Sequence, residues 1–533
     1  MKRRNFIKCC SMAVPGAIFA NSAGSNFGSN LMSGTIKTPR HKMYDDDFIK
    51  KMADTANFTA KKLGASYSDF RLSNFRSQNV STREQVIQSI RENENFGFAV
   101  RVIIEGTWGF AASSTFSEDE VSGVTKKACE IALANKSIQL NRVELVSTPV
   151  YNDSWKTPIK KSAFEVSIDD KVDLLFGVNA KAKSFGADFC SSFIWAVNEW
   201  KYFASSEGSY IKQDLHRIWT SFDVTVIDKA TGDFASRDAF TAPIGKGYEY
   251  LEEYDYMKDV EEAVEHLKIK QKSPSVEPAR RDIILDPTHL WLTIHESCGH
   301  PTELDRALGY EANYAGTSFM TTDKLGKLQY GSEAITIKGD RTQKDGLATR
   351  GYDDDGVKTT EWDIINKGRF VGYQTTREIA KAVGEPSSNG CAYADSWSHF
   401  PIQRMPNVSL MPGEKKLSLS DLIADTEDGI YIKGDGSWSI DMQRYNFQFT
   451  GQEFWEIKNG KIIGMLRDVA YQGNTVDLWN SCDAVCDSSE YKLGGSFFCG
   501  KGEPGQVSPV SHGSSPARFR NVKILNTSKE AGK

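Results

Sequence analysis

The chain has 533 residues, with 65 basic and 70 acidic side chains and 39% hydrophobic residues. This composition is typical of a globular protein and excludes a disordered chain or a fibre. At roughly 150 residues per domain, the length allows about two to four domains. The net charge of −5, with no basic block after the first eight residues, argues against nucleic-acid binding, because phosphate contacts require a basic surface. Nine cysteines are too few for a disulfide scaffold.

The first 22 residues have the order of regions found in a secretory signal peptide. A basic start containing Arg3-Arg4 precedes an apolar stretch over 9–20 and then small residues suited to cleavage. The arginine pair resembles the twin-arginine signal of exported bacterial proteins. We predict that residues 1–22 form such a signal and that the protein is exported to the periplasm; with a non-functional, frayed N-terminus it would be cytoplasmic. No later stretch reaches the ~18 apolar residues of a membrane helix, so stable membrane insertion is not expected.

The segment after the signal alternates helices and strands. Apolar residues at helical spacing predict a helix over 44–63, and the alternating residues 98–112 predict a β-hairpin that turns at Gly106. Ser117 and Ser167 each stand before an apolar, helix-forming run with an acidic residue three positions later, which predicts two further helices with serine N-caps.

Two more elements complete this segment. Residues 189–227 predict several short strands of an antiparallel meander, and 257–269 predict an amphipathic helix. The polar, proline-bearing stretch 271–280 is typical of a linker. We therefore predict an N-terminal α/β domain over 44–270 and a second domain over 281–533.

The second domain is predicted to be mainly antiparallel β, which makes the whole chain an α+β protein. Residues 281–286 predict a strand, and a helix begins at Pro287. Two segments, 363–372 and 456–464, resemble each other, and each is predicted to be a hairpin that turns at its Asn and Gly. They fit a duplicated β unit and also the ordinary similarity of hairpins in a large sheet.

The sequence HESCGH, residues 295–300, lies at the end of the helix that begins at Pro287. Two imidazoles with Glu296 directly after the first can bind a metal ion and deprotonate a water molecule. Side chains five residues apart diverge by about 140° around an α-helix, so an ideal helix could not aim both at one ion. We expect the helix to distort or end here, because Gly299 loosens the turn and Pro301 disfavours the α conformation at His300.

A metal centre of this kind needs a third protein ligand. Cys298 is close in sequence but lies between the two histidines. Cys499 is the stronger candidate, because glycines on both sides predict a loop that can approach a metal closely; a buried thiol in a glycine-rich turn is the alternative. Two imidazoles and a thiolate leave the fourth zinc position open for water. Ser297 is expected to pack in the helix rather than act as a nucleophile.

Several ordered motifs resemble the TldD/PmbA family, also called modulators of DNA gyrase, whose members are zinc-dependent peptidases. The motifs are HExxxH at 295–300, Cys499-Gly-Lys501, and the segments 97–103, 108–110, 351–356 and 404–413. The resemblance implies that His295, His300 and Cys499 bind Zn²⁺ and that Glu296 is the general base. The presence of all these residues implies the metal-bearing, TldD-like type.

The resemblance also implies partners and a mode of binding. Family members work as dimers, and this chain would pair with itself or with a metal-free relative. Peptides would be held as extended strands in an internal cavity. We therefore predict an exported zinc peptidase that acts on unfolded or modified peptides. A non-catalytic peptide-binding protein with a structural zinc is the alternative; an oxidoreductase is disfavoured because no nucleotide-binding fingerprint or cluster-ligand cysteine spacing is present.

Other candidate residues carry weaker signals. Cys482 and Cys486 could form a disulfide after export or be two unrelated buried thiols. The acidic residues 353–355 lack the ligand spacing of a calcium loop and are predicted to form a solvated turn. His399 and Arg404 lie in or near a family-like segment and are candidates for contact with the peptide or with a developing oxyanion.

Overall fold

The structure is a computed structural model that describes residues 44–530. The predicted signal, residues 1–22, lies outside the described residues. Residues from Asp45 onward form one compact unit, and the boundary that we place at 271–280 stays a prediction. Within the described part of the chain, none of the helices combines the length and the apolar character needed to cross a membrane.

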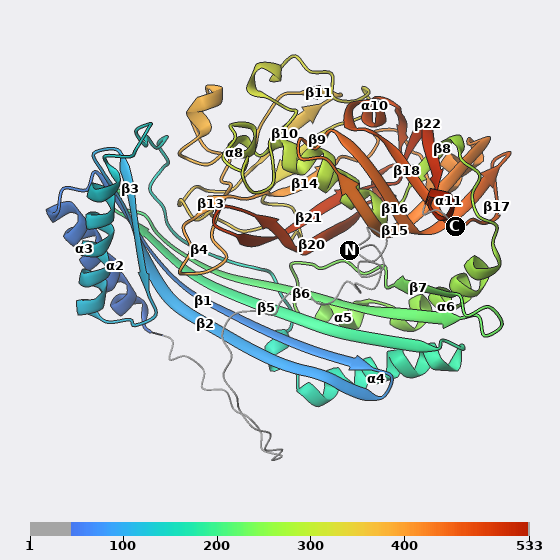
Figure 1. Cartoon of the computed structure of the whole chain (residues 1–533). Helices are drawn as coiled ribbons and strands as arrows, with labels where there is room; N and C mark the ends of the chain where they lie inside the picture. The colour runs from blue at the N-terminus through green and yellow to red at the C-terminus, as the bar shows by residue number, and fades with distance from the viewer. Residues whose placement is uncertain (1–43, 531–533) are drawn as a thin grey trace, which may run out of the picture. The chain divides into compact units, whose positions relative to one another are not determined.

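The N-terminal part is built on a seven-stranded sheet with the strand order β3-β2-β1-β5-β6-β4, and β7 pairs with β6 (Figure 1). Neighbouring strands are antiparallel except for β4 and β6. The strands are β1 (Tyr67–Arg83), β2 (Val86–Ile104), β3 (Thr107–Ser113), β4 (Asn152–Lys156), β5 (Phe189–Ser205), β6 (Tyr210–Ile227) and β7 (Phe234–Asp238). The predicted hairpin around Gly106 is confirmed as the β2–β3 pair.

Helices pack on this sheet near its two ends. Helices α2 and α3 lie at one end, and α4 and α6 lie at the other (Figure 1). Their bounds, with the short α5, are α2 (Asp46–Lys62), α3 (Glu118–Asn135), α4 (Ile168–Ser184), α5 (Glu249–Glu253) and α6 (Tyr256–Lys272). The predicted N-caps are confirmed, because the side chains of Ser117 and Ser167 accept hydrogen bonds from the backbone of Glu120 and Asp170.

The structure has two long strands, β5 and β6, where we predict several short strands over 189–227, so that prediction is wrong. Each is continuous, and a turn at 206–209 joins them. The charged residues Glu199 and Lys201 are both buried within β5. Lys201 pairs with Asp354 at 2.8 Å, so a partner far along the chain keeps this polar residue inside a long strand.

The C-terminal part contains a second seven-stranded sheet, in the order β15-β8-β22-β18-β16-β17 with β19 on β22. A four-stranded sheet, β11-β10-β9-β14, and two hairpins accompany it. The pairs are antiparallel except for β8 with β15, so the prediction of a mainly antiparallel region is confirmed. The strands of the large sheet are β8 (Ala279–Leu285), β15 (Asp428–Ile440), β16 (Asn446–Lys458), β17 (Lys461–Met465), β18 (Val469–Asn474), β19 (Cys482–Val485) and β22 (Ala517–Asn526).

The remaining elements of the C-terminal part are short. The other strands are β9 (Ile337–Asp340), β10 (Glu361–Asn366), β11 (Arg369–Phe370), β12 (Ala392–Tyr393), β13 (Ile402–Gln403), β14 (Asn407–Leu410), β20 (Lys492–Lys501) and β21 (Gln506–Ser514). The α-helices are α7 (Pro287–Ile294), α8 (Leu304–Ala307), α9 (Leu419–Ala424), α10 (Thr475–Asn480) and α11 (Thr527–Glu530). Single 3₁₀ turns lie at His300–Thr302, Thr322–Lys324, Ala380–Val383 and Ser488–Glu490, and one more, Ala163–Glu165, lies in the N-terminal part.

The two similar segments are both hairpins, but they belong to different sheets. The first joins β10 to β11 in the four-stranded sheet, and the second joins β16 to β17 in the seven-stranded sheet. The first turns at Lys367-Gly368 rather than at Asn366, because Asn366 still pairs with Arg369 in the ladder. The second turns at Asn459-Gly460 as predicted.

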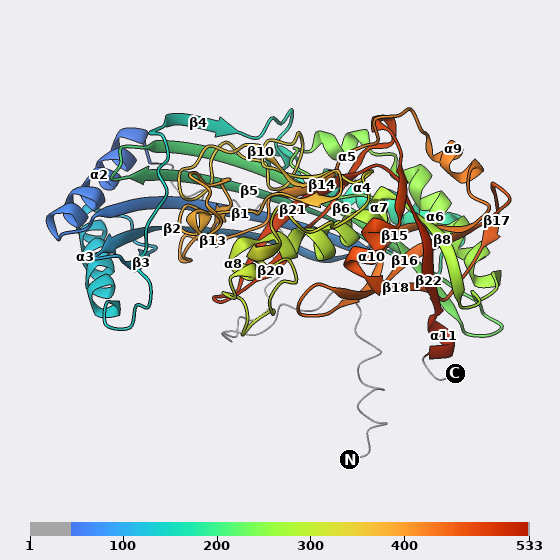
Figure 2. The same ribbon diagram turned by 90° about the horizontal axis from the view of Figure 1, so that it is seen from above.

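The β20–β21 hairpin lies over strands β5 and β6 of the first sheet, as Figure 1 and Figure 2 both show. Leu347 and Phe497 pack there on Val197, with Trp195 and Trp219 beside them. The first sheet therefore forms the support on which the Cys499 strand rests.

Acidic residues 353–355 are buried at the same contact between the two parts, so the solvated turn predicted for them is wrong. Their exposed fractions are between 1% and 7%. Asp355 pairs with Arg101 of β2 at 2.8 Å, and Asp354 pairs with Lys201 of β5. The basic partners on the first sheet offset the cost of burying these carboxylates.

Candidate functional site

Helix α7 carries the first histidine to the site. Asp286 caps the helix by accepting a hydrogen bond from Thr288 N, and Pro287 occupies the first turn, where its missing N–H is not needed. The helix ends at Ile294, and a π-helical turn, His295–Gly299, continues from it. The motif therefore begins where the α-helical hydrogen-bond pattern changes.

The π turn brings residues five apart onto one face. The N–H of His300 donates to the carbonyl of His295, which is the i to i+5 bond of a π turn, and the two imidazole centroids lie 4.6 Å apart. The expected effect of Pro301 is wrong, because His300 has α-helical backbone angles, φ −62° and ψ −45°. One extra residue in the turn, rather than an early helix end, aligns the two rings.

Gly299 has a packing role in this turn. A Cβ atom at this position would lie 2.5 Å from the sulfur of Met405, closer than real contacts allow. The absence of a side chain therefore lets Met405 pack directly on the turn that holds the histidines.

Cys499 lies in strand β20 and not in the loop that we predict. One of the surrounding glycines serves packing on α7: a Cβ atom at Gly494 would lie 2.5 Å from Trp291. Helix α7 and strand β20 can therefore approach closely. The β20–β21 register shifts between Ser496 and Cys499, and the Cys499 sulfur lies 3.8 Å from Nε2 of His300.

The structure brings His295, His300 and Cys499 together. All three are buried, and their nitrogen and sulfur ligand atoms lie within 4.8 Å of one another. Two imidazoles and one thiolate form a donor set that fits a metal ion such as zinc. Cys298 is not part of this group; it lies in the hydrophobic core.

Hydrogen bonds outside the group fix the orientation of both imidazoles. Nδ1–H of His300 donates to Glu303 at 2.8 Å. Nδ1–H of His512 donates to the carbonyl of Val408 at 2.8 Å, which leaves its Nε2 to accept from Nδ1–H of His295, also at 2.8 Å. His295 and His300 each donate through Nδ1 and therefore each keep a lone pair on Nε2, the arrangement that metal-binding histidines require.

The pKa shifts of His300 and Cys499 agree with this arrangement, whereas the pKa of His295 is raised, because the effect of burial is outweighed by the Cys499 thiolate when no cation is bound. Burial lowers the pKa of His300 well below its usual value, which favours the neutral imidazole. Burial alone would raise the pKa of Cys499, but the nearby His300, His295 and Arg404 outweigh it and hold that pKa well below its usual value. A neutral imidazole and a thiolate are the forms that bind metals.

Sequence reasoning missed Glu303, His512 and the role of Lys501. Lys501 is buried and pairs with Glu303 at 3.1 Å, Asp305 at 2.7 Å and Glu311 at 3.2 Å. The lysine therefore connects the Cys499 strand with the carboxylate that orients His300. Its place two residues after Cys499 was a usable signal, and so was the rarity of histidine, with eight in the chain.

Glu296 is buried beside the three-residue group. One of its oxygens, Oε2, forms an ion pair with Nη1 of Arg444, which lies between β15 and β16. The carboxylate is therefore held in place by a guanidinium in addition to the π turn.

Arg404 and His399 do not join the group. Arg404 is fully buried and donates to the carbonyls of Cys499 and Gln506, so it braces the β20–β21 hairpin. His399 pairs with Asp395 at 2.5 Å.

Ser297, Cys482 and Cys486 are the remaining residues that the sequence singles out. Ser297 donates to Thr293 O and accepts from Trp479 Nε1, so its predicted packing role is confirmed. Cys482 and Cys486 are both buried and free of disulfides.

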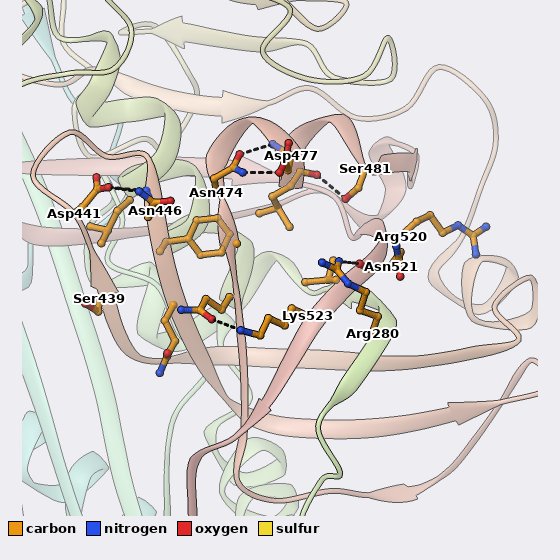
Figure 3. A pocket seen from close by; sticks show the side chains of 17 residues that line it. Arg280, Ser439, Asp441, Asn446, Asn474, Asp477, Ser481, Arg520, Asn521 and Lys523 are labelled. Atoms are coloured by element: carbon orange, nitrogen blue, oxygen red, sulfur yellow. Dashed lines mark hydrogen bonds between the residues drawn. The ribbon is translucent and has the colours of Figure 1, made fainter. Parts of the chain in front are cut away.

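A pocket of about 920 Å³ lies elsewhere in the C-terminal part, and Figure 3 shows its polar lining. None of the four predicted site residues lines it. Several lining side chains bond to each other instead, such as Lys523 with Gln472 at 2.9 Å and Asn474 with Asp477. The pocket holds no group of titratable side chains comparable with the buried site.

Comparison with known proteins agrees with the motifs. Residues 278–525 match the model of the PmbA/TldA metallopeptidase C-terminal domain, and 68–132 match that of domain 1. The chain belongs to the TldD/PmbA family. Relatives within this family are named metalloproteases, so the chain is a member of a metallopeptidase family.

Two relatives illustrate the extent of the similarity. A metalloprotease of Methanocaldococcus jannaschii is 28% identical over 458 residues, which cover 85% of this chain and 95% of the relative. A zinc metalloprotease TldD homologue of Saccharolobus solfataricus is 25% identical over 475 residues, covering 87% and 98%.

Solved structures of TldD/PmbA-like proteins share the fold. A proposed modulator of DNA gyrase from Thermotoga maritima matches with a TM-score of 0.71 at 16% identity, over 90% of this chain and all of that one. TldE from Thermococcus kodakarensis matches with a TM-score of 0.69 at 17% identity, with the same coverage. At these identities the likeness establishes the mixed α and β fold.

Proposed function

We propose that this TldD/PmbA protein is a zinc-dependent peptidase. The proposal rests on one observation: the side chains of His295, His300 and Cys499 form a buried cluster, and Glu296 lies beside it. A zinc metalloprotease among the relatives supports the choice of metal. Three protein ligands leave one position for water or substrate, as catalytic zinc sites do.

The residues of the chain have distinct roles in this proposal. His295, His300 and Cys499 would hold the ion, which when bound polarises the scissile carbonyl and makes water a better nucleophile. Glu296 accepts a proton from the attacking water and passes it to the leaving amine. Glu303 and His512 hold the two imidazoles in the tautomers that leave Nε2 free.

Substrate, partner and location belong to the same proposal. We infer that the substrates are unfolded or modified peptides, bound as extended strands in a cavity of a dimer. The dimer would contain two copies of this chain or one copy with a metal-free relative. The N-terminal sequence supports export to the periplasm through a twin-arginine-like signal.

A non-catalytic peptide-binding protein with a structural zinc is the second candidate. The ion pair between Glu296 and Arg444 favours it, because the carboxylate oxygen that contacts the guanidinium is not free to accept a proton from water. One oxygen of Glu296 remains outside the ion pair, and this oxygen is what the peptidase needs.

The variant Glu296→Gln separates the two candidates. We expect it to keep zinc and to lose peptide cleavage by about 10²–10⁴-fold, the usual contribution of a general base. Metal content and cleavage of an unfolded peptide are measured together. The exposed Glu333→Gln is the matched control and should match the wild type. Wild-type rates in Glu296→Gln contradict the role of Glu296, and no cleavage by the zinc-loaded wild type favours the binding protein.

A further inference from the structure

Arg444 has an unusual backbone conformation beside the candidate site. Its φ is +66°, in the left-handed region that non-glycine residues rarely adopt. The residue lies in the turn 441–445, which connects β15 to β16. Such conformations cost about 1–3 kcal/mol and persist where the surrounding structure holds them in place.

The turn is held by its own hydrogen bonds. Asp441 accepts from the backbone of Tyr445 at 2.8 Å and of Asn446 at 3.0 Å, and from the side-chain amide of Asn446 at 2.7 Å. Figure 3 shows Asp441 and Asn446 joined at the base of this turn. These bonds keep the two ends of the turn closed.

Neighbouring elements hold the turn from outside. Thr475 of α10 donates to the carbonyl of Arg444 at 2.8 Å, and the buried Arg306 donates to the carbonyl of Met442 at 3.0 Å. The position of Arg444 is therefore determined by three separate parts of the chain.

The side chain of Arg444 has donors to spare. Nη1 binds Oε2 of Glu296, whereas Nε is buried without a hydrogen-bond partner among the described residues. The side chain is 16% exposed, so part of it remains reachable. Arg444 therefore has hydrogen-bond donors that Glu296 does not occupy.

We propose that Arg444 is a second catalytic residue, which donates a hydrogen bond to the substrate carbonyl oxygen as that oxygen gains negative charge. This inference rests on the proposed peptidase function. The carbonyl that is attacked with the help of Glu296 must lie next to Glu296, and Arg444 contacts that same carboxylate. A fixed cationic donor at that place is the feature that stabilises a developing oxyanion.

The step balances without a further reagent. The water oxygen bonds to the carbonyl carbon, its proton moves to Glu296, and the π electrons of the C=O bond move to the oxygen that Arg444 contacts. When the carbonyl reforms, the C–N bond breaks and Glu296 returns the proton to the amine. Arg444 keeps all its protons, because an arginine does not deprotonate under these conditions.

The test compares Arg444→Met and Arg444→Lys with the wild type. We expect Arg444→Met to lower kcat by about 10²–10³-fold, the cost of removing one oxyanion donor, with KM within about threefold and zinc content unchanged. Its affinity for a phosphinic peptide, which mimics the tetrahedral oxyanion, should fall by a similar factor in calorimetry. Arg444→Lys keeps the charge, so its kcat and its phosphinate affinity should lie between those of the wild type and those of Arg444→Met.

Arg281→Met is the control, because Arg281 is a buried arginine of the same sheet that pairs with Asp428 and Glu456. It should leave kcat and phosphinate affinity unchanged even if it lowers Tm. Arg444→Met with wild-type or higher kcat, or with zinc lost in proportion to activity, overturns the proposal. If the wild type cleaves no peptide, the proposed function fails and the catalytic role of Arg444 fails with it; the phosphinate affinities then show only whether Arg444 contacts the oxyanion mimic.

Discussion

The orientation of the two histidines of the motif depends on residues that are not themselves candidate metal ligands. His300 is oriented by Glu303, three residues later, and His295 by His512, which lies on β21. The first partner is local and could be predicted from the helical spacing of the sequence. The second could not, because the pairing of β20 with β21 and the packing of α7 on both strands place His512 there.

We predict that His512→Ala weakens zinc binding by about 10–100-fold, the usual effect of losing a partner of a metal-bound histidine. The variant leaves Nδ1–H of His295 without its acceptor, so the ring is free to turn and to change tautomer. Competition with a chelator of known affinity measures the change.

His289→Ala is the control for this variant. His289 is an equally buried histidine of α7, bonded to Tyr471 and to the carbonyl of Gly434. Its loss should lower Tm but leave zinc affinity unchanged. Equal zinc affinities in His512→Ala and the wild type would contradict the orienting role of His512.

At the scale of elements, the site depends on the close packing of α7 against β20. The glycines around Cys499 predict a close approach, which the structure shows at Gly494, but the sequence does not say which element approaches. Glycine permits close approach both in a loop beside a metal ion and in a strand packed against a helix, so it does not distinguish the two. The π turn has a similar ambiguity: the spacing of His295 and His300 requires a distortion but does not specify its kind.

We predict that Gly494→Ala destabilises the protein by about 1–3 kcal/mol and lowers its zinc content, because the new methyl group overlaps Trp291 and forces β20 away from α7. Thermal unfolding and metal analysis measure both effects.

Gly500→Ala, next to Cys499 in the same strand, is the matched control. A Cβ atom there meets no other atom within 4 Å, so its stability should stay within about 0.5 kcal/mol of the wild type. If Gly494→Ala and Gly500→Ala behave alike, packing against α7 does not position the cysteine.

At the scale of the whole molecule, local signals predicted most elements. Helix caps, hairpin turns and the mainly antiparallel C-terminal part follow from residues close together in sequence. Two errors arise where a residue's partner is distant: 189–227 is predicted as several short strands although Lys201 is buried within the continuous strand β5, and 353–355 is predicted as a solvated turn. Lys201 and Asp354 are buried because they meet each other across the contact between the two parts of the chain.

The buried charges also connect the fold with the site. Arg217 and Lys201 of the first sheet pair with Glu199, whose pKa is lowered to about 2 because these cations outweigh the effect of burial. Arg217 also donates to the carbonyl of Leu347, which packs on Phe497 of β20. The first sheet thereby supports the strand that carries Cys499.

We propose that His295, His300 and Cys499 together hold a zinc ion, and the metal content of the purified full chain tests this proposal most directly. We predict about one zinc ion per chain in the wild type and its loss from His295→Ala, His300→Ala and Cys499→Ala. Cys298→Ala, which removes the buried core cysteine of the same motif, should keep its zinc. Full retention of zinc in Cys499→Ala would contradict the account.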